Sequence, residues 1–92
     1  MEDKYREIVR EFYEIYGPLR KKYNLRSHMC FSIYDDGLIE IWEYRGETKG
    51  KGIVKVKEPE SVDCYKRAIE WLKCYKKERE EAEHGTKADM AV

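Results

Sequence analysis

The stretch from Met29 to Tyr44 constrains the fold more than any other part of this 92-residue chain. Two runs rich in strand-favouring residues flank a turn made of Asp35, Asp36 and Gly37. Apolar residues that alternate on both sides of an Asp-Gly turn are typical of a β-hairpin. The stretch therefore predicts two antiparallel strands joined by a tight loop.

The register of this hairpin decides which side chains share a face, because a slip of one residue exchanges the two faces. A two-residue loop at Asp36-Gly37 separates Ile39 and Ile41 from the aliphatic residues of the first strand, whereas a three-residue loop with a left-handed Gly37 gathers them. We expect the second register, which pairs Tyr34 with Leu38, Ile33 with Ile39, Phe31 with Ile41 and Cys30 with Trp42. Its core face carries Met29, Phe31, Ile33, Ile39 and Ile41, and its other face carries His28, Cys30, Ser32, Tyr34, Leu38, Glu40, Trp42 and Tyr44.

Helical periodicity appears on both sides of the hairpin. From Glu2 to about Tyr23 the apolar residues fall within an arc of about 120°, which predicts an amphipathic helix, kinked or briefly re-nucleated at Gly17-Pro18. Asn24 suits a left-handed C-cap. A second helix is predicted from about Pro59 to Glu83. Its core stripe consists of Val62, Tyr65, Ala68, Ile69 and Leu72, with a flank formed by Cys64, Trp71 and Tyr75.

Residues 53–57 alternate apolar and basic side chains and predict a short third strand, preceded by a flexible connection at 46–52. The element order is then helix, three antiparallel strands, helix. This is an α+β fold in which both helices cover one face of the sheet and leave the other face open. We expect a single domain over residues 1–84 and a flexible C-terminal tail over residues 85–92.

The element order resembles that of the double-stranded RNA-binding domain, and the resemblance is limited to topology. That family has a Gly-Pro-x-His segment between its first two strands, where this chain has Asp35-Asp36-Gly37. Its lysine-rich run opens the last helix, where this chain has Glu60-Ser61-Val62-Asp63. Because neither RNA-contacting segment is matched, the resemblance assigns no RNA-binding residues here.

Composition limits the class of protein and of partner. The 19 basic and 19 acidic side chains cancel, which removes the overall positive field of a non-specific nucleic-acid binder. Charged residues make up 41% of the chain, Gln is absent and Asn24 is the only Asn, a composition associated with thermophile proteins. Three widely spaced cysteines form no disulfide framework, and no apolar run has the length of a membrane span. We expect a soluble, cytoplasmic protein with reduced thiols.

Residues that could carry catalysis or bind a metal have simpler explanations. The glycine-rich segment 46–52 departs from a phosphate-binding loop in its glycine spacing and precedes a strand. His28 and the cysteines lack the close spacing of metal ligands, and Asp35-Asp36 suits a tight turn. No serine has a base beside it in the sequence. We therefore expect no enzymatic activity, no metal and no cofactor.

The open sheet face and the flank of the second helix carry aromatic residues that a partner could cover. Such residues concentrate at the centres of protein interfaces, and an exposed patch of them is a liability in a monomer. The sequence predicts a small non-enzymatic interaction module, a homodimer that binds a protein partner and has the size of viral accessory or inhibitor proteins. The expected interface residues are Tyr34, Trp42, Tyr44, Cys64, Trp71 and Tyr75.

Nucleic acid is the alternative partner. Aromatic rings on a strand surface, flanked by cations, can stack unpaired bases. Two basic runs, within residues 20–26 and 45–57, are expected at one end of the sheet. The residues of this alternative are Arg20, Lys21, Lys22, Arg26, Arg45, Lys49, Lys51, Lys55 and Lys57, together with the rings of Tyr34, Trp42 and Tyr44.

Overall fold

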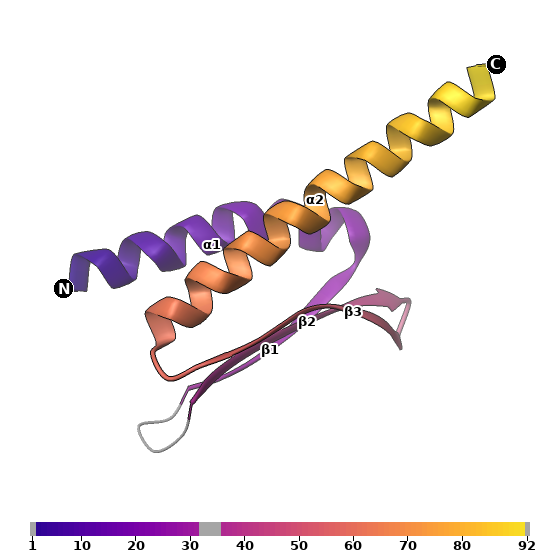
Figure 1. Ribbon diagram of the computed structural model, residues 1–92. Helices are drawn as coiled ribbons and strands as arrows, with labels where there is room; N and C mark the ends of the chain where they lie inside the picture. The colour runs from indigo at the N-terminus through magenta and orange to yellow at the C-terminus, as the bar shows by residue number, and fades with distance from the viewer. Residues whose placement is uncertain (1, 32–35, 92) are drawn as a thin grey trace.

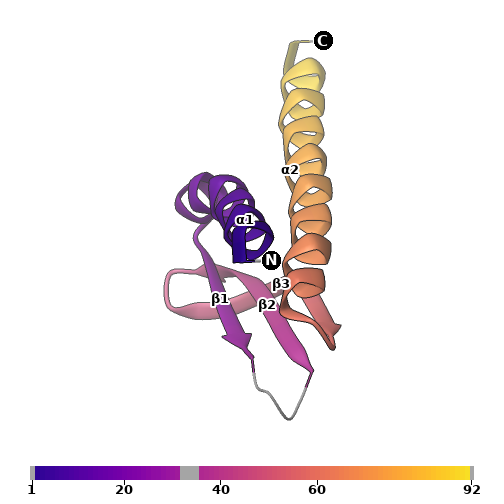
Figure 2. The same ribbon diagram turned by 90° about the vertical axis from the view of Figure 1, so that its left-hand side faces the viewer.

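The computed structural model describes the backbone of residues 2–31 and 36–91 and the side chains of residues 3–31 and 36–83. Its elements are, in order, α1 (Glu2–Tyr23), β1 (Leu25–Cys30), β2 (Gly37–Arg45), β3 (Thr48–Glu58) and α2 (Ser61–Ala91). The strands form an antiparallel sheet in the order β1-β2-β3. Both helices lie on one side of this sheet (Figure 1, Figure 2). The predicted α+β fold and its element order are confirmed.

The first helix continues through Gly17-Pro18 without a break. Its apolar face stays in phase across the proline, since Phe12 and Tyr16 before it and Leu19 after it are all buried. Pro18 itself is exposed. Packing of this face against the rest of the protein therefore outweighs the amide hydrogen bond that the proline cannot make.

Asn24 ends α1 in the left-handed conformation expected of a C-cap, with a φ of 52°. Its side-chain amide donates hydrogen bonds to the carbonyl oxygens of Tyr44 at 3.0 Å and Gly46 at 3.3 Å. Its own carbonyl accepts from the Tyr44 amide at 3.0 Å. The end of α1 is thereby fixed to the turn between β2 and β3.

The register between β1 and β2 differs from the predicted one by four residues. Ile41 pairs with Ser27 in place of Phe31. The predicted pairing of Cys30 with Trp42 is also wrong, because Trp42 pairs with Arg26. Leu38 and Ile39 pair with Cys30 and Met29 and not with Tyr34 and Ile33, which lie outside the described residues.

The shift has a physical reason at the start of β1. Leu25 pairs with Glu43 and is 1% exposed, so the observed register buries an aliphatic side chain that the predicted one left outside the hairpin. Phe31 remains 39% exposed. Because the shift is an even number of residues, it does not exchange the faces, and Ile39 and Ile41 are fully buried as expected.

Gly37 is the first residue of β2 and does not form a left-handed turn, contrary to the prediction. A Cβ atom at this position would lie 2.8 Å from Phe31 Cδ1 and 3.0 Å from Cys64 Sγ. The glycine is therefore required by the close approach of a ring and a thiol to the backbone. Within the described ranges, the glycine with a positive φ is Gly46, at 62°.

The third strand begins at Thr48, so the predicted flexible connection at 46–52 shortens to the turn residues Gly46-Glu47. Its pairing with β2 shifts register twice, on either side of Trp42. At the first shift Ile53 is the extra residue, and Ile53 and Val54 are both buried, as a β-bulge allows. At the second shift, a Cβ on Gly50 would lie 2.7 Å from the Glu43 carbonyl oxygen. Glycine at this position lets the bulged strand approach β2.

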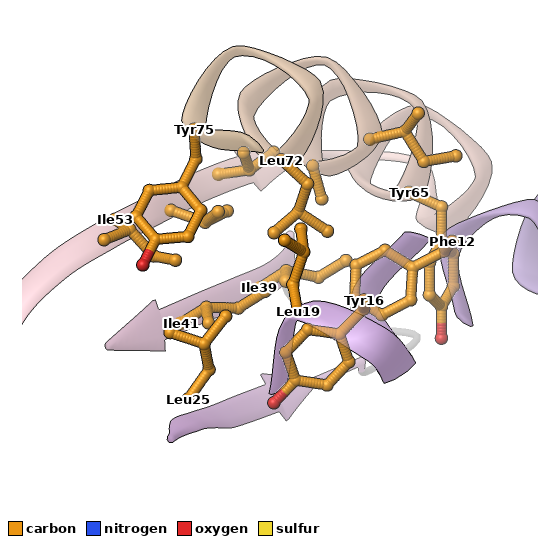
Figure 3. Close-up of a cluster of buried hydrophobic side chains, with 14 of the residues drawn as sticks. Phe12, Tyr16, Leu19, Leu25, Ile39, Ile41, Ile53, Tyr65, Leu72 and Tyr75 are labelled. Atoms are coloured by element: carbon orange, nitrogen blue, oxygen red, sulfur yellow. The ribbon is translucent and has the colours of Figure 1, made fainter. Parts of the chain in front are cut away.

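The hydrophobic core lies between the sheet and the two helices (Figure 3). Phe12 is fully buried, and its ring centroid lies 5.4 Å from that of Tyr16 and 5.3 Å from that of Tyr65. The second helix contributes Cys64, Tyr65, Ala68, Ile69, Leu72 and Tyr75 to this core. It then continues to Ala91, through residues that the sequence assigns to a tail, and projects past the sheet (Figure 1).

Candidate interaction surface on the helix-free sheet face

One face of the sheet is covered by no described helix, and we call it the open face (Figure 1, Figure 2). Alternation along the strands and the observed register define its members. They are Arg26, His28, Cys30, Leu38, Glu40, Trp42, Tyr44, Lys49, Lys55 and Lys57. Four of these carry a positive charge, and Glu40 is the single acid among them. The open face is therefore basic although the whole chain is neutral.

Trp42 is half-buried at the centre of this face. Its indole packs on Gly52 of β3, where an added Cβ would come within 3.3 Å of Trp42 Cδ1. The Lys49 Nζ atom lies 3.8 Å from the centroid of the indole. An ammonium group in this position is held by the negative face of the ring, a contact that contributes about 0.5–1 kcal/mol at exposed sites.

Tyr44 carries a second ring on the same strand, two residues beyond Trp42. The guanidinium carbon of Arg26 lies 4.6 Å from the centroid of this ring. Tyr44 also pairs with Lys49 across the strands. Each ring of the open face therefore has its own cation, and the two ring and cation pairs are neighbours.

The basic residues predicted for nucleic-acid binding come together in part. Arg20, Lys21 and Lys22 form the last turn of α1, which Asn24 fixes beside the β2–β3 turn and Arg45. Lys22 Nζ lies 3.4 Å from Glu83 of α2, and hydrogen bonding to Tyr23 together with this carboxylate raises the pKa of Lys22. These residues lie at one end of the sheet, and Lys51 lies there too, because it lines a hollow with Tyr23 and Arg45 as well as a groove beside α2.

The predicted helix flank does not form one exposed surface. Cys64 is fully buried and Tyr75 is 8% exposed, which corrects their assignment to a surface flank. α2 packs against both β3 and β2, so residues well away from the centre of its apolar stripe are also covered. Burial raises the pKa of the Cys64 thiol. Trp71, in contrast, is 44% exposed, and Tyr34 lies outside the described residues.

The sequence does not predict the contacts of Lys49 with the Trp42 ring and of Arg26 with the Tyr44 ring. The predicted flexible connection at 46–52 includes Lys49, and the sequence predicts no ring contact for Arg26. The alternation of lysine and glycine over residues 49–52 was the available indication, since glycines in a strand mark bulges and close contacts.

The described residues form neither a metal site nor a membrane-spanning helix. Over the described residues, no three or more His, Cys, Asp or Glu side chains are grouped closely enough to hold a metal ion. The described helices include none with the length and apolar character that crossing a bilayer requires. Comparisons with models of protein families, with curated proteins and with solved structures give no match.

Proposed function

We propose that this protein is a binding module that takes up single-stranded nucleic acid on its open face. The observation that carries the proposal is the pairing of Trp42 with Lys49 and of Tyr44 with Arg26 on a basic, helix-free sheet surface. Nucleic-acid proteins that bind single strands combine stacking rings with a positive groove along the backbone. The open face has both components.

The charge of the open face favours an anionic partner over a second copy of the chain. A two-fold contact through this face would bring the same basic patch of both copies together, so Arg26, Lys49, Lys55 and Lys57 of each copy would share the interface with only one acid, Glu40, from each copy. Juxtaposed like charges cost several kcal/mol at an interface. The homodimer expected from the sequence is therefore less compatible with this surface than a polyanion.

Binding involves an exchange at each ring. A base that stacks on Trp42 displaces the Lys49 ammonium from the indole, and the freed cation can contact a phosphate. The ammonium contact is worth about 0.5–1 kcal/mol and base stacking about 1–3 kcal/mol, so the exchange is favourable. The same exchange applies to Tyr44 and Arg26.

Fluorescence anisotropy of a labelled single-stranded oligonucleotide, measured over a range of salt concentrations, tests the proposal. With four phosphate contacts, the logarithm of the binding constant should fall with the logarithm of salt concentration with a slope of about −3. The double variant Lys55→Gln, Lys57→Gln should reduce the steepness of this slope by about 1.4. Trp42→Leu should weaken binding by about 1–3 kcal/mol.

A matched control is available on the helices. Lys4 and Lys66 are exposed and take part in none of the ion pairs found among the described residues. The variant Lys4→Gln, Lys66→Gln changes the total charge equally and should bind like the parent protein. Equal losses in the two double variants would show that only net charge matters.

Three further results would overturn the proposal. Polyglutamate that binds as tightly as the oligonucleotide, with no dependence on Trp42, would indicate an acidic protein partner. A dimer in light scattering that Trp42→Leu dissociates would indicate self-association through the open face. No binding to any single strand at low salt would also refute it.

A further inference from the structure

A groove of about 470 Å³ lies between β3 and α2. Residues 51–53 of β3 line one side, and Glu70, Trp71, Cys74 and Glu78 of α2 line the other. Because β3 is an edge strand, the groove lies at the margin of the sheet. It is a second surface with a different composition.

Trp71 differs from the other described aromatic residues in the contacts of its ring. Cations lie over the rings of Tyr23, Trp42 and Tyr44 at 3.8 to 5.3 Å from their centroids. In the described part of the chain, no cation and no second ring is in such contact with Trp71. It is nevertheless 44% exposed and lines the groove.

Two carboxylates flank this ring along α2. Glu70 and Glu78 are eight residues apart, about 12 Å along a helix axis, and both line the groove. Neither takes part in the ion pairs found among the described residues. With Lys51 as the opposing charge, the groove has a formal net charge of −1, from two acids and one base. Its charge is opposite to that of the open face.

We propose that this groove binds a lysine or arginine side chain of a partner protein. The aliphatic part of such a side chain can lie along the apolar wall while its charged group contacts the indole and a carboxylate. Trp is the ring best suited to hold a cation, and an exposed Trp at an interface is a frequent hot spot. The inference does not depend on nucleic-acid binding, because Glu70, Trp71 and Glu78 lie on α2 and do not belong to the open face.

The test uses the full chain and a blocked pentapeptide with arginine between alanines. The indole N–H signals of Trp42 and Trp71 are followed by NMR and assigned with Trp71→Phe. Saturable movement of the Trp71 signal, with a dissociation constant of about 1 mM, is expected while the Trp42 signal stays in place. A peptide with neutral citrulline in place of arginine should leave both signals unmoved.

Variants distinguish a specific site from general charge attraction. Glu70→Gln and Glu78→Gln should each weaken arginine-peptide binding about threefold, the size expected of exposed ion pairs. The control Glu80→Gln, Glu81→Gln removes two acids from the same helix beyond the groove and should have no effect. Circular dichroism confirms that each variant is folded.

Each contrary result refutes the inference. An unmoved Trp71 signal, or equal movement with the citrulline peptide, excludes a cation site. If the control variant weakens arginine-peptide binding equally, the binding arises from the overall charge of the helix and not from the groove. Movement of the Trp71 signal with protein concentration alone identifies a second copy of the chain as the occupant. Oligonucleotide binding is measured separately and should not respond to the Glu70 and Glu78 variants.

Discussion

The phenol of Tyr75 in α2 donates a hydrogen bond to the Glu43 carboxylate in β2, with 3.0 Å between the two oxygen atoms. Arg79, one turn further along the helix, places Nη2 4.0 Å from the same carboxylate. Tyr75 is 8% exposed and belongs to the hydrophobic core. Glu43 is therefore a polar side chain on the helix-covered face of the sheet, and residues of α2 supply its hydrogen-bond donor and its opposite charge.

Replacing Tyr75 by Phe should destabilise the protein because the ring remains while Glu43 loses its donor. A hydrogen bond to a charged group contributes about 1.5–3 kcal/mol, and this is the expected loss in the free energy of unfolding measured in urea. Tyr13→Phe is the control, since Tyr13 is 49% exposed, and a change within about 0.5 kcal/mol is expected there. Equal effects of the two variants would contradict the role of Glu43.

Replacing Gly37 by Ala should destabilise the protein through overcrowding. The added Cβ would meet Phe31 at 2.8 Å and the buried Cys64 thiol at 3.0 Å. Overpacking of this kind costs about 1–3 kcal/mol, to be measured by urea unfolding.

A double-mutant cycle identifies the cause of this loss. In a Phe31→Ala background the ring is gone, so Gly37→Ala should cost less than in the parent protein. Strictly additive losses would show that the ring contact is not responsible.

The alternation of residues allowed the sheet faces to be predicted, but not the register. Ile39 and Ile41 are buried as expected because any even shift keeps them on the core face. The four-residue register shift buries Leu25, an aliphatic residue that precedes the predicted hairpin. The sequence of the turn carries no information about the burial of this residue. Long-range packing thus selected among registers that the loop sequence left open.

Helical periodicity likewise predicts on which side of the helix each side chain lies, but it does not predict which of these side chains are buried. Cys64, Trp71 and Tyr75 share a flank of α2 by angle, yet Cys64 and Tyr75 are buried and Trp71 is not. The difference depends on where β2 and β3 lie beneath the helix. The contact of Lys49 with Trp42 depends in turn on two bulges in β3, which the glycines of residues 49–52 indicate without fixing the register.

Alkaline pH should destabilise the protein through two core tyrosines. Burial raises the pKa of Tyr65 from 10.0 to about 12, and burial with the hydrogen bond to Glu43 raises the pKa of Tyr75 further. In the unfolded chain both phenols ionise near pH 10.

The sign of the effect follows from linkage. Below pH 10 both states hold the phenol protons and the stability is fully present. Above it the unfolded chain releases protons that the folded chain retains, so the free energy of unfolding falls as pH rises toward the folded pKa values.

Urea unfolding at pH 9, 10 and 11, with phenolate absorbance recorded in parallel, measures this fall. Tyr65→Phe and Tyr75→Phe should each flatten the pH dependence, because each removes one group whose pKa differs between the two states. Tyr13→Phe again serves as the control and should retain the slope of the parent protein. A slope that neither core variant changes would show that the alkaline loss arises from other groups, such as Lys22, whose pKa is also raised.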